Sequence, residues 1–369
     1  MKVLLVDLET EWRGGQNQAL LLLKGLRERG HEARLVTANG SALAQRAATS
    51  GVHVHSVSRG LFRFPAGWRV REILRSGRFD VVHANEAHAV SAVWLGLWDR
   101  RKPLPVPLVI SRRVGYPIGR SPLAQARYRA AARIIAISRW SAERAIGSGI
   151  PEQKVTIVYE GVGIPTLPPL GKRAAARSRW GVTEDTFLLG CVGVLSPDKG
   201  QESLIRALAE VRRKYPAVRL LLAGDGPCRA RLEALARELG LGDAVIFAGF
   251  VGDVEEVYAA LDLFLLPSLF EALSNALMSA MAYALPSIAF NCGGPAEIIE
   301  DGKSGLLVEA GNVNGLTTSI ARMLDSPEFA KMIGMRGRER IQENFSVEKM
   351  VDGMIRVYES CDTRVPGKG

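Results

Sequence analysis

A single acidic residue stands at the head of a long apolar segment. Residues 270–286 read FEALSNALMSAMAYALP, and Glu271 is the only carboxylate among them. Ser274 is a good N-cap, so a helix is predicted to start there and to be buried, because the residues that follow are nearly all apolar. The free N–H groups of such a helix favour an anion. A carboxylate beside an anion needs a different partner, and sugar hydroxyls suit it, because it accepts two hydrogen bonds in fixed geometry.

Glycines and a lysine follow other predicted strands. Gly14 and Gly15 come after the first strand and open a helix, where a backbone without side chains lets a ligand approach closely. Lys199 stands in SPDKG at another helix entrance and suits phosphate oxygens. A plain turn and a surface lysine are the ordinary alternatives. The spacing at 14–15 is not GxGxxG, so a dinucleotide fingerprint is excluded there, and GDGP (224–227) is a weak signal by itself.

Two of the five histidines, His83 and His88, lie in DVVHANEAHAV (80–90), at and after a strand end. Loops at strand ends carry functional side chains in α/β proteins. For each histidine a satisfied, partly buried ring is the alternative. His53 and His55 alternate in GVHVHSV, which is typical of a half-exposed strand.

Short β-branched runs alternate with helical patterns along the whole chain. This rhythm predicts parallel sheets covered by helices, which is an α/β architecture. It pauses at the proline-rich residues 163–173, which predict an extended linker, so two doubly wound domains are expected. Ligands of such sheets bind beyond the carboxyl ends of the strands, and two facing domains would form a cleft. The predicted strands are 3–8, 33–38, 80–84, 107–111, 133–138, 187–194, 218–224, 244–249, 261–267 and 286–290.

The composition is that of a globular protein without a secretory or membrane-spanning segment. The chain has 369 residues and is 47% hydrophobic, and no run approaches the roughly 20 apolar residues of a spanning helix. The four cysteines form no Cys-x-x-Cys pair. A disulfide framework and a zinc site are therefore not predicted, and a cytoplasmic location is.

The net charge of +10 is unevenly distributed. Residues 1–169 hold 25 Lys and Arg against 12 Asp and Glu, a net +13, so the remainder carries −3. Anionic lipid headgroups, phosphorylated substrates and nucleic acid are candidate partners, with simple solubility as the alternative. Residues 61–79 mix aromatic side chains with arginines, which suits a membrane interface or the solvated face of a packed helix. The recognition motifs of nucleic-acid-binding modules are missing, so no nucleic acid is expected.

Residues 267–312 resemble the family 4 glycosyltransferases, which have the GT-B fold. The similar stretch contains P-S, Glu271, A-M-A, G-G-P-A-E and D-G-K-S-G-L-L-V, and supporting marks include Gly14-Gly15, D-V-V-H, S-P-D-K-G, G-D-G-P and F-A-G-F. The resemblance covers nearly the whole chain. It implies two Rossmann-like domains facing a central cleft, an acceptor-binding domain at 1–166 and a nucleotide-sugar-binding domain at 173–345. A helix within 346–369 would pack back on the first domain.

The resemblance also implies roles for individual residues. His88 would lie near the transferred sugar, with His83 and Asn85 as fallbacks, and Glu271 would bind hydroxyl groups of that sugar. The transfer would retain anomeric configuration, with no metal or other cofactor. Arg112 and Arg113, at a strand end in the basic half, are expected to meet an acceptor phosphate or carboxylate. The implied donor contacts are Gly14, Gly15, Lys199, Gly249, Phe250, Val251, Leu273, Ser274, Asn275 and Ser279.

Three positions depart from the family pattern. Ser279 stands where a second glutamate commonly holds the ribose, Val194 where many members have a phosphate-binding arginine, and Ala284 where glycine is usual. One lost charge-assisted contact is worth roughly 1.5–3 kcal/mol. The predicted function is still sugar transfer, from a UDP-sugar or next a GDP-sugar, to a glycan or lipid-linked anionic acceptor, as in lipopolysaccharide synthesis. Peripheral contact with an anionic membrane is expected, and a non-catalytic nucleotide-sugar-binding paralogue is the alternative.

Overall fold

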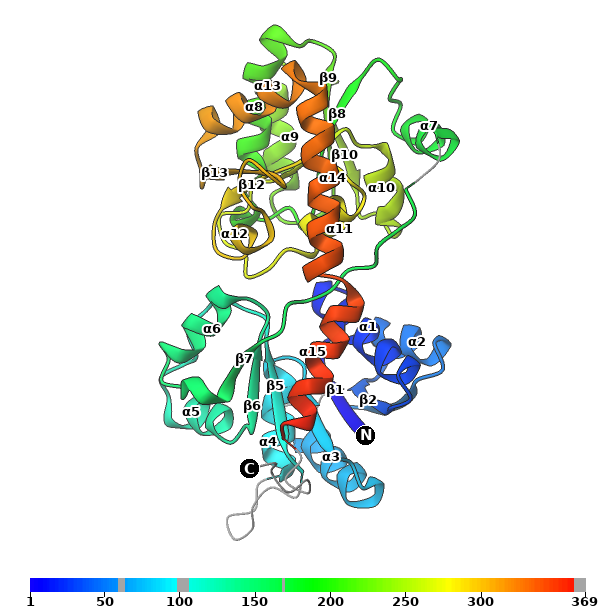
Figure 1. Cartoon of the computed structure of the whole chain (residues 1–369), viewed down its shortest axis with the longest axis vertical. Coiled ribbons are helices and arrows are strands. Elements are labelled where there is room, and N and C mark those ends of the chain that lie inside the picture. The colour runs from blue at the N-terminus through cyan, green and yellow to red at the C-terminus, as the bar shows by residue number, and fades with distance from the viewer. Residues whose placement is uncertain (59–63, 98–105, 168–169, 362–369) are drawn as a thin grey trace. The chain divides into compact units, whose positions relative to one another are not determined.

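The computed structural model describes residues 1–58, 64–97, 106–167 and 170–361, which form two compact units (Figure 1). The first unit combines residues 1–161 with helix α15 (Val347–Glu359), and the second is Val162–Ser346. Each contains one parallel sheet of the Rossmann type, which confirms the predicted fold class. The predicted linker is too long, because helix α7 (Leu170–Arg179) starts inside it. Its sequence LGKRAAARSR consists mostly of strong helix formers.

The first unit is built on a seven-stranded parallel sheet in the order β3-β2-β1-β4-β5-β6-β7. Each strand predicted for this half is present within about two residues, and the half-exposed strand with His53 and His55 is edge strand β3. Strand β7 was not predicted, because its three residues give too short a pattern. The strands are β1 (Lys2–Asp7), β2 (Glu32–Ala38), β3 (His53–Val57), β4 (Val81–Ala84), β5 (Leu108–Arg112), β6 (Arg133–Ala136) and β7 (Val155–Ile157).

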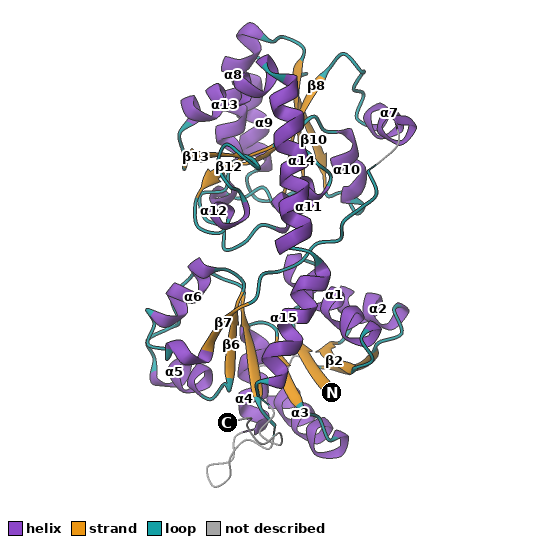
Figure 2. Cartoon of the chain, viewed as in Figure 1, coloured by secondary structure: helices purple, strands orange, loops and turns teal. Residues whose placement is uncertain are grey.

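Helices cover both faces of this sheet, as Figure 2 shows. Leu4 and Val6 of β1 pack in one core with α3 and α4, and Val3 and Leu5 pack in the other with α1, α2 and α15. Alternate side chains of a strand point to opposite faces, so both faces of β1 are buried and its sequence is continuously apolar. The remaining helices are α1 (Gly14–Glu28), α2 (Ala42–Thr49), α3 (Phe64–Gly77), α4 (Ala87–Leu97), α5 (Pro122–Arg129) and α6 (Arg139–Ile146).

Helix α15 lies against α1 in the first unit (Figure 1). A Cβ atom added to Gly25 would come within 2.5 Å of the Val351 side chain, so a glycine is needed for this close approach. Arg29 also bonds Asp352 at 2.8 Å. The chain therefore returns to complete the core of the unit in which it began.

The second unit has a six-stranded parallel sheet in the order β10-β9-β8-β11-β12-β13. All of its predicted strands are present, and β13 is additional. The strands are β8 (Phe187–Val192), β9 (Val218–Ala223), β10 (Val245–Gly249), β11 (Leu263–Leu266), β12 (Ser287–Asn291) and β13 (Leu306–Glu309). The helices besides α7 are α8 (Gln201–Lys214), α9 (Arg229–Glu238), α10 (Val254–Ala260), α11 (Asn275–Ala282), α12 (Pro295–Ile298), α13 (Val313–Asp325) and α14 (Pro327–Asn344).

The strand order reverses once in each sheet, and these points determine where ligands can bind. The reversal lies between β1 and β4 in the first unit and between β8 and β11 in the second. Loops that leave neighbouring strands at a reversal run to opposite faces of the sheet and open a crevice at the carboxyl edge. The residues that follow β1, β4, β8 and β11 are therefore the first places to look for a site.

Across the ranges that the structure describes, no helix is both long enough and apolar enough to cross a bilayer.

Candidate functional site

The reversal in the second unit brings together Lys199 and Glu271. Lys199 ends the short turn after β8, and Glu271 lies in the loop after β11. The Nζ atom of Lys199 is 2.6 Å from Oε2 of Glu271, and the hydroxyl of Ser268 donates to the same oxygen at 3.3 Å. Within the described ranges no hydrogen bond reaches Oε1, so this oxygen can accept from a ligand hydroxyl.

The Lys199–Glu271 pair is mostly buried but open to a ligand. The side chains are 27% and 14% exposed, respectively. Burial disfavours the ammonium ion, but the charge and hydrogen bond of Glu271, helped by Asp198, outweigh burial and raise the pKa of Lys199 above its usual value. Lys199 is therefore a permanent cation at neutral pH, as a phosphate-binding group must be.

Two glycines hold the loops around Glu271 in close contact. Gly200 has a φ of +65°, and a Cβ there would lie 2.2 Å from the carbonyl oxygen of Pro267. A Cβ on Gly294, after β12, would lie 2.2 Å from the carbonyl oxygen of Ala272, and the Gly294 N–H donates to the Glu271 carbonyl at 2.9 Å. These approaches are possible only without side chains, so the two loops fix the backbone on both sides of Glu271.

Helix α11 begins directly after this loop, as predicted. The Ser274 hydroxyl accepts from the N–H of Leu277 at 3.2 Å, which confirms Ser274 as the N-cap. Leu273 and Ser274 are buried, Asn275 is the first helical residue, and most of the helix is buried, also as predicted. The N-terminus of α11 thus starts four residues from Glu271, beside a cation.

The other predicted donor contacts lie at neighbouring strand ends. Gly249 ends β10 with a φ of +69°, Phe250 is 76% exposed, and Val251 is buried. Ser279 is half-buried on α11 and hydrogen-bonds the hydroxyl of Tyr258, so its hydroxyl already has a protein partner. Val194 is exposed after β8. An exposed apolar side chain at this edge gives an anion no charge to bind.

The reversal in the first unit contains a buried polar network below the Gly14-Gly15 turn. Asp7, at the end of β1, accepts from Gln16 at 3.1 Å and from Asn85 at 2.7 Å. Arg113 donates to Asn85 at 2.9 Å and pairs with buried Glu160. Because Arg113 already has a carboxylate partner, an acceptor anion would have to compete with Glu160 for it.

Gly14 and Gly15 are the first two residues of α1, as the sequence predicted. A Cβ on Gly15 would meet Arg113 only at an ordinary contact distance of 3.7 Å. Packing within the unit therefore does not require a glycine at this position.

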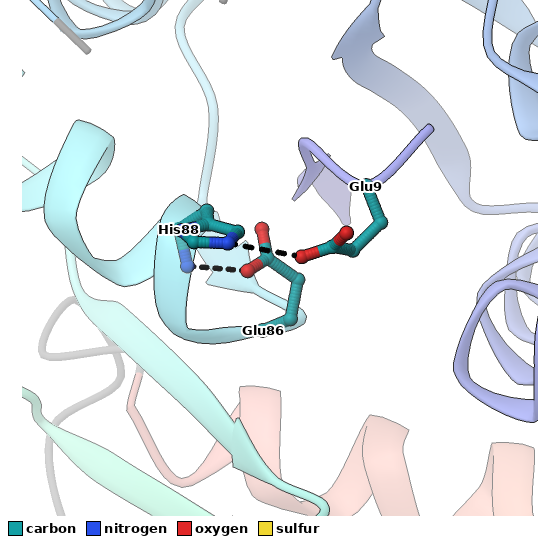
Figure 3. A group of neighbouring side chains, drawn as sticks. All are labelled: Glu9, Glu86 and His88. Carbon is teal, nitrogen blue, oxygen red and sulfur yellow. Dashed lines mark hydrogen bonds and ion pairs between the residues drawn. The ribbon is translucent and has the colours of Figure 1, made fainter. Parts of the chain in front are cut away.

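Three side chains at the same edge form a second cluster, shown in Figure 3. Nε2 of His88 lies 3.2 Å from Oε1 of Glu9, and the two side chains are 36% and 35% exposed. Glu86 caps α4: its carboxylate accepts from the backbone N–H groups of His88, of Ala89 at 2.6 Å and of Leu8 at 3.1 Å. Glu9 follows β1 and Glu86 follows β4, so the two sides of the strand reversal meet at His88.

Burial raises the pKa of two carboxyl groups at the strand reversal near His88. Burial and then the nearby charge of Asp7 raise the pKa of Glu86 to about 7, although its three backbone hydrogen bonds act in the other direction. Burial also raises the pKa of Asp7, against the hydrogen bonds from Asn85, Glu9 and Gln16 and the charge of Arg113. At this reversal, burial and the closeness of the two carboxyl groups therefore outweigh the hydrogen bonds and the positive charge of Arg113.

Two fallback residues and one predicted acceptor contact lie in the interior. His83 and Asn85 are fully buried, and His83 is hydrogen-bonded to Tyr358 at 2.7 Å and Ser111 at 2.8 Å. His83 is thus a satisfied core histidine. Arg112 is also buried and donates to the carbonyl of Tyr116, so it shapes the following loop.

Sequence reasoning missed Glu9, Glu86 and Ser268. Their signal was position: each follows a predicted strand within three residues, as do His88 and Glu271 within five. Single acidic or hydroxyl residues in loops are common, and only the strand order shows that the loops after β1 and β4 are neighbours.

Comparison with known proteins adds the family. The profile described as Glycosyltransferase Family 4 matches residues 12–164, and that of Glycosyl transferases group 1 matches residues 172–340. The matches include Glu271, Lys199 and His88 and the whole strand reversal of the second unit, whereas β1 precedes the first matched residue. The chain belongs to the family 4 glycosyltransferases. The resemblance read from residues 267–312 is confirmed, and the enzyme class with it.

Individual relatives agree with the family. Lipopolysaccharide core biosynthesis glycosyltransferase LpsD of Rhizobium meliloti is 26% identical over 97% of this chain and 98% of its own. GDP-mannose-dependent alpha-(1-6)-phosphatidylinositol monomannoside mannosyltransferase of Mycolicibacterium smegmatis is 29% identical over 70% of this chain and 73% of its own. Relatives above 30% identity match over about half of their own length.

Among solved structures, HepE of Anabaena in complex with UDP-glucose superposes on 98% of this chain and 100% of its own. The TM-score is 0.85 at 23% sequence identity. This likeness supports the GT-B fold, in which each of the two units has one of the two parallel sheets.

Proposed function

We propose that this chain transfers a sugar from a nucleotide-sugar donor to an anionic glycan or lipid-linked acceptor, with retention of anomeric configuration. A UDP-sugar is the favoured donor and a GDP-sugar the next. The observation that carries the proposal is the Lys199–Glu271 pair at the strand reversal of the second unit. It offers a cation for a diphosphate and a carboxylate oxygen for a sugar hydroxyl within a few ångströms.

The donor contacts follow from that pair. The diphosphate lies at Lys199 and the N-terminus of α11, where charge and N–H groups stabilise it as it leaves. Oε1 of Glu271 accepts from the sugar. The family resemblance assigns His88 a role near the transferred sugar. No metal is required, because Lys199 and the helix supply the positive charge. UDP-glucose in the HepE structure and the GDP-mannose of the mycobacterial relative are the precedents for the two donors tested first.

The acceptor proposal rests on the basic half of the chain. On α3, Trp68 is 68% exposed and shares a helix face with Arg71 and Arg75, at positions i, i+3 and i+7. These three side chains, with Glu72 and Ser76, line a shallow groove. An exposed tryptophan beside arginines suits the headgroup region of an anionic membrane, so a lipid-linked acceptor would be met at the inner face of the cytoplasmic membrane. The relative LpsD acts in lipopolysaccharide core synthesis, which is chemistry of this kind.

The donor test is calorimetric titration of UDP, GDP and ADP, and of their common sugar forms, into the wild type and Glu271→Ala. We expect one nucleotide to bind clearly and its sugar form to bind about ten- to a hundredfold more weakly to the variant, since a hydrogen bond to a charged group is worth about 1.5–3 kcal/mol. The bare nucleotide should lose little. The matched control is Glu328→Ala, an exposed glutamate on α14.

Two outcomes would refute the donor proposal. Equal losses for the sugar form and the bare nucleotide would place Glu271 away from the sugar. Binding without turnover over a broad set of acceptors would favour a non-catalytic paralogue. Two features motivate this alternative, the hydroxyl of Ser279, which already has a protein partner, and the exposed apolar side chain of Val194. Turnover that survives a strong chelator supports transfer without a metal.

The membrane test compares binding of the wild type and Trp68→Ala to anionic and neutral vesicles. Binding should require anionic lipid and should weaken in the variant, whereas Arg213→Gln, in the second unit, should bind as the wild type does. Equal binding of the wild type to neutral vesicles would count against the proposal.

A further inference from the structure

We propose that Glu9, Glu86 and His88 form a binding site for a first-row divalent cation of the zinc type. One ligand atom from each residue lies within 4.8 Å of the other two (Figure 3). The family assignment and the proposed transfer reaction call for no metal here. A cation at this place would hold the ring nitrogen of His88, so it would act as an inhibitor of the proposed reaction.

The distances fit a small cation. Zinc binds imidazole nitrogen and carboxylate oxygen at about 2.0–2.2 Å, so two ligands in tetrahedral geometry lie about 3.3 Å apart. The separation of Nε2 of His88 and Oε1 of Glu9 is 3.2 Å. The third ligand atom, from Glu86, is at most 4.8 Å from either, so a side-chain shift of up to about 1.5 Å completes the set.

Glu86 can contribute an oxygen without losing its structural role. A carboxylate has about four lone-pair directions, and the three backbone N–H groups at the start of α4 use three of them. One direction remains for a cation. The backbone bonds fix the carboxylate in place, as groups around a metal ligand commonly do.

The chemistry of the ligands selects the class of cation. One imidazole and two carboxylates suit zinc, cobalt or manganese, whereas calcium and magnesium prefer oxygen ligands alone. Glu9 and His88 are each about one-third exposed, so a cation can enter from solvent and keep water in its remaining positions.

The alternative is that Glu9 only orients His88 through an ordinary ion pair. The two interpretations differ in a measurable way, because Co²⁺ bound by imidazole and carboxylate has a visible absorption spectrum that an ion pair cannot produce. The untagged, metal-free whole chain is titrated with Co²⁺, and Zn²⁺ is then added to displace it.

Four proteins are compared. The wild type should bind one Co²⁺, and Glu9→Gln and His88→Gln should each bind it at least about tenfold more weakly, because each removes one ligand. His53→Gln is the matched control, since His53 and His55 have ring centres 4.5 Å apart on edge strand β3 and are outside the proposed site. This variant should retain the wild-type spectrum. Equal melting temperatures would show that the three variants are folded.

The proposal is overturned if no spectrum appears, if it is lost in His53→Gln, or if it survives in both Glu9→Gln and His88→Gln. A separate assay compares sugar transfer by the wild type with added Zn²⁺ and after chelation. Inhibition that chelation reverses, and that His53→Gln shares, is expected. The Co²⁺ spectrum does not depend on transfer. Metal binding without any transferase activity would thus refute only the proposed function, and transfer without Co²⁺ binding would refute only this inference.

Discussion

Acid should destabilise the first unit through His83. This ring is fully buried between Tyr358 of α15 and Ser111 of β5, at 2.7 and 2.8 Å. Burial, and then the charge of Arg113, lower the pKa of His83 to about 3, whereas an unfolded histidine titrates near 6.5. Between these values the unfolded chain binds a proton that the folded chain does not. The free energy of unfolding therefore falls as the pH falls below 6.5.

The size of the effect depends mainly on the unfolded state. At pH 5 an unfolded histidine is almost fully protonated, which favours unfolding by about 2 kcal/mol relative to pH 7.5. For a unit of this size that corresponds to roughly 4–8 °C in melting temperature. Glutamine lacks the titrating ring and its hydrogen bonds, so the free energy of unfolding of His83→Gln should be lower than that of the wild type at every pH. Between pH 7.5 and 5, however, this free energy should fall by about 2 kcal/mol less in the variant than in the wild type.

The assay is calorimetric melting of the whole chain at several pH values. Hydrogen exchange in β4 and α15 identifies the transition of the first unit, because the two units need not melt together. The control is His53→Gln on edge strand β3, which replaces an exposed histidine outside this core. If His83→Gln keeps the full wild-type dependence on pH, the buried ring is not the proton-linked group and the reasoning fails.

Three further substitutions test the backbone and core of the second unit. Ala284 has a φ of +58°, so Ala284→Gly should raise the free energy of unfolding by about 1 kcal/mol in urea titration; a loss would show that the turn is unstrained. Gly200→Ala should weaken nucleotide binding at least about tenfold, since its Cβ would meet the Pro267 carbonyl beside Lys199; unchanged calorimetric affinity would contradict this. Arg177 is buried and bonds Asp262 at 3.1 Å and the Ala260 carbonyl at 2.9 Å, so Arg177→Met should cost about 3–5 kcal/mol; a melting temperature within error of the wild type would refute that.

Local patterns predicted much of the fold. Apolar runs placed nearly every strand, and Ser274 marked the start of α11. Strands β7 and β13 were not predicted, because three or four residues are too few to show a periodic pattern. The start of α7 was assigned to the linker, because Pro165 and the prolines that follow it dominate that part of the sequence. Both outcomes have the same cause, because a prediction from local pattern uses only residues that are neighbours in the sequence.

The candidate site was only partly predictable. Glu271, Lys199 and His88 were named from their positions after strands and from the family resemblance. That Lys199 contacts Glu271, and that His88 contacts Glu9, depends on which strands are neighbours in the sheet. The sequence order β1, β2, β3, β4 does not reveal that β4 pairs with β1.

Burial decided the rest. His83 and His88 stand five residues apart and look equally suited to chemistry in the sequence, yet one is enclosed by α15 and the other is open to solvent. Arg112 and Arg113 are adjacent in the sequence, and each has a partner that the sequence does not identify. Arg112 donates to the backbone carbonyl of Tyr116, and Arg113 pairs with the distant Glu160. The sequence by itself determined the elements, the charge distribution and the family. The tertiary structure decided which side chains are accessible and which are neutralised, because solvation and partners come from segments far apart along the chain.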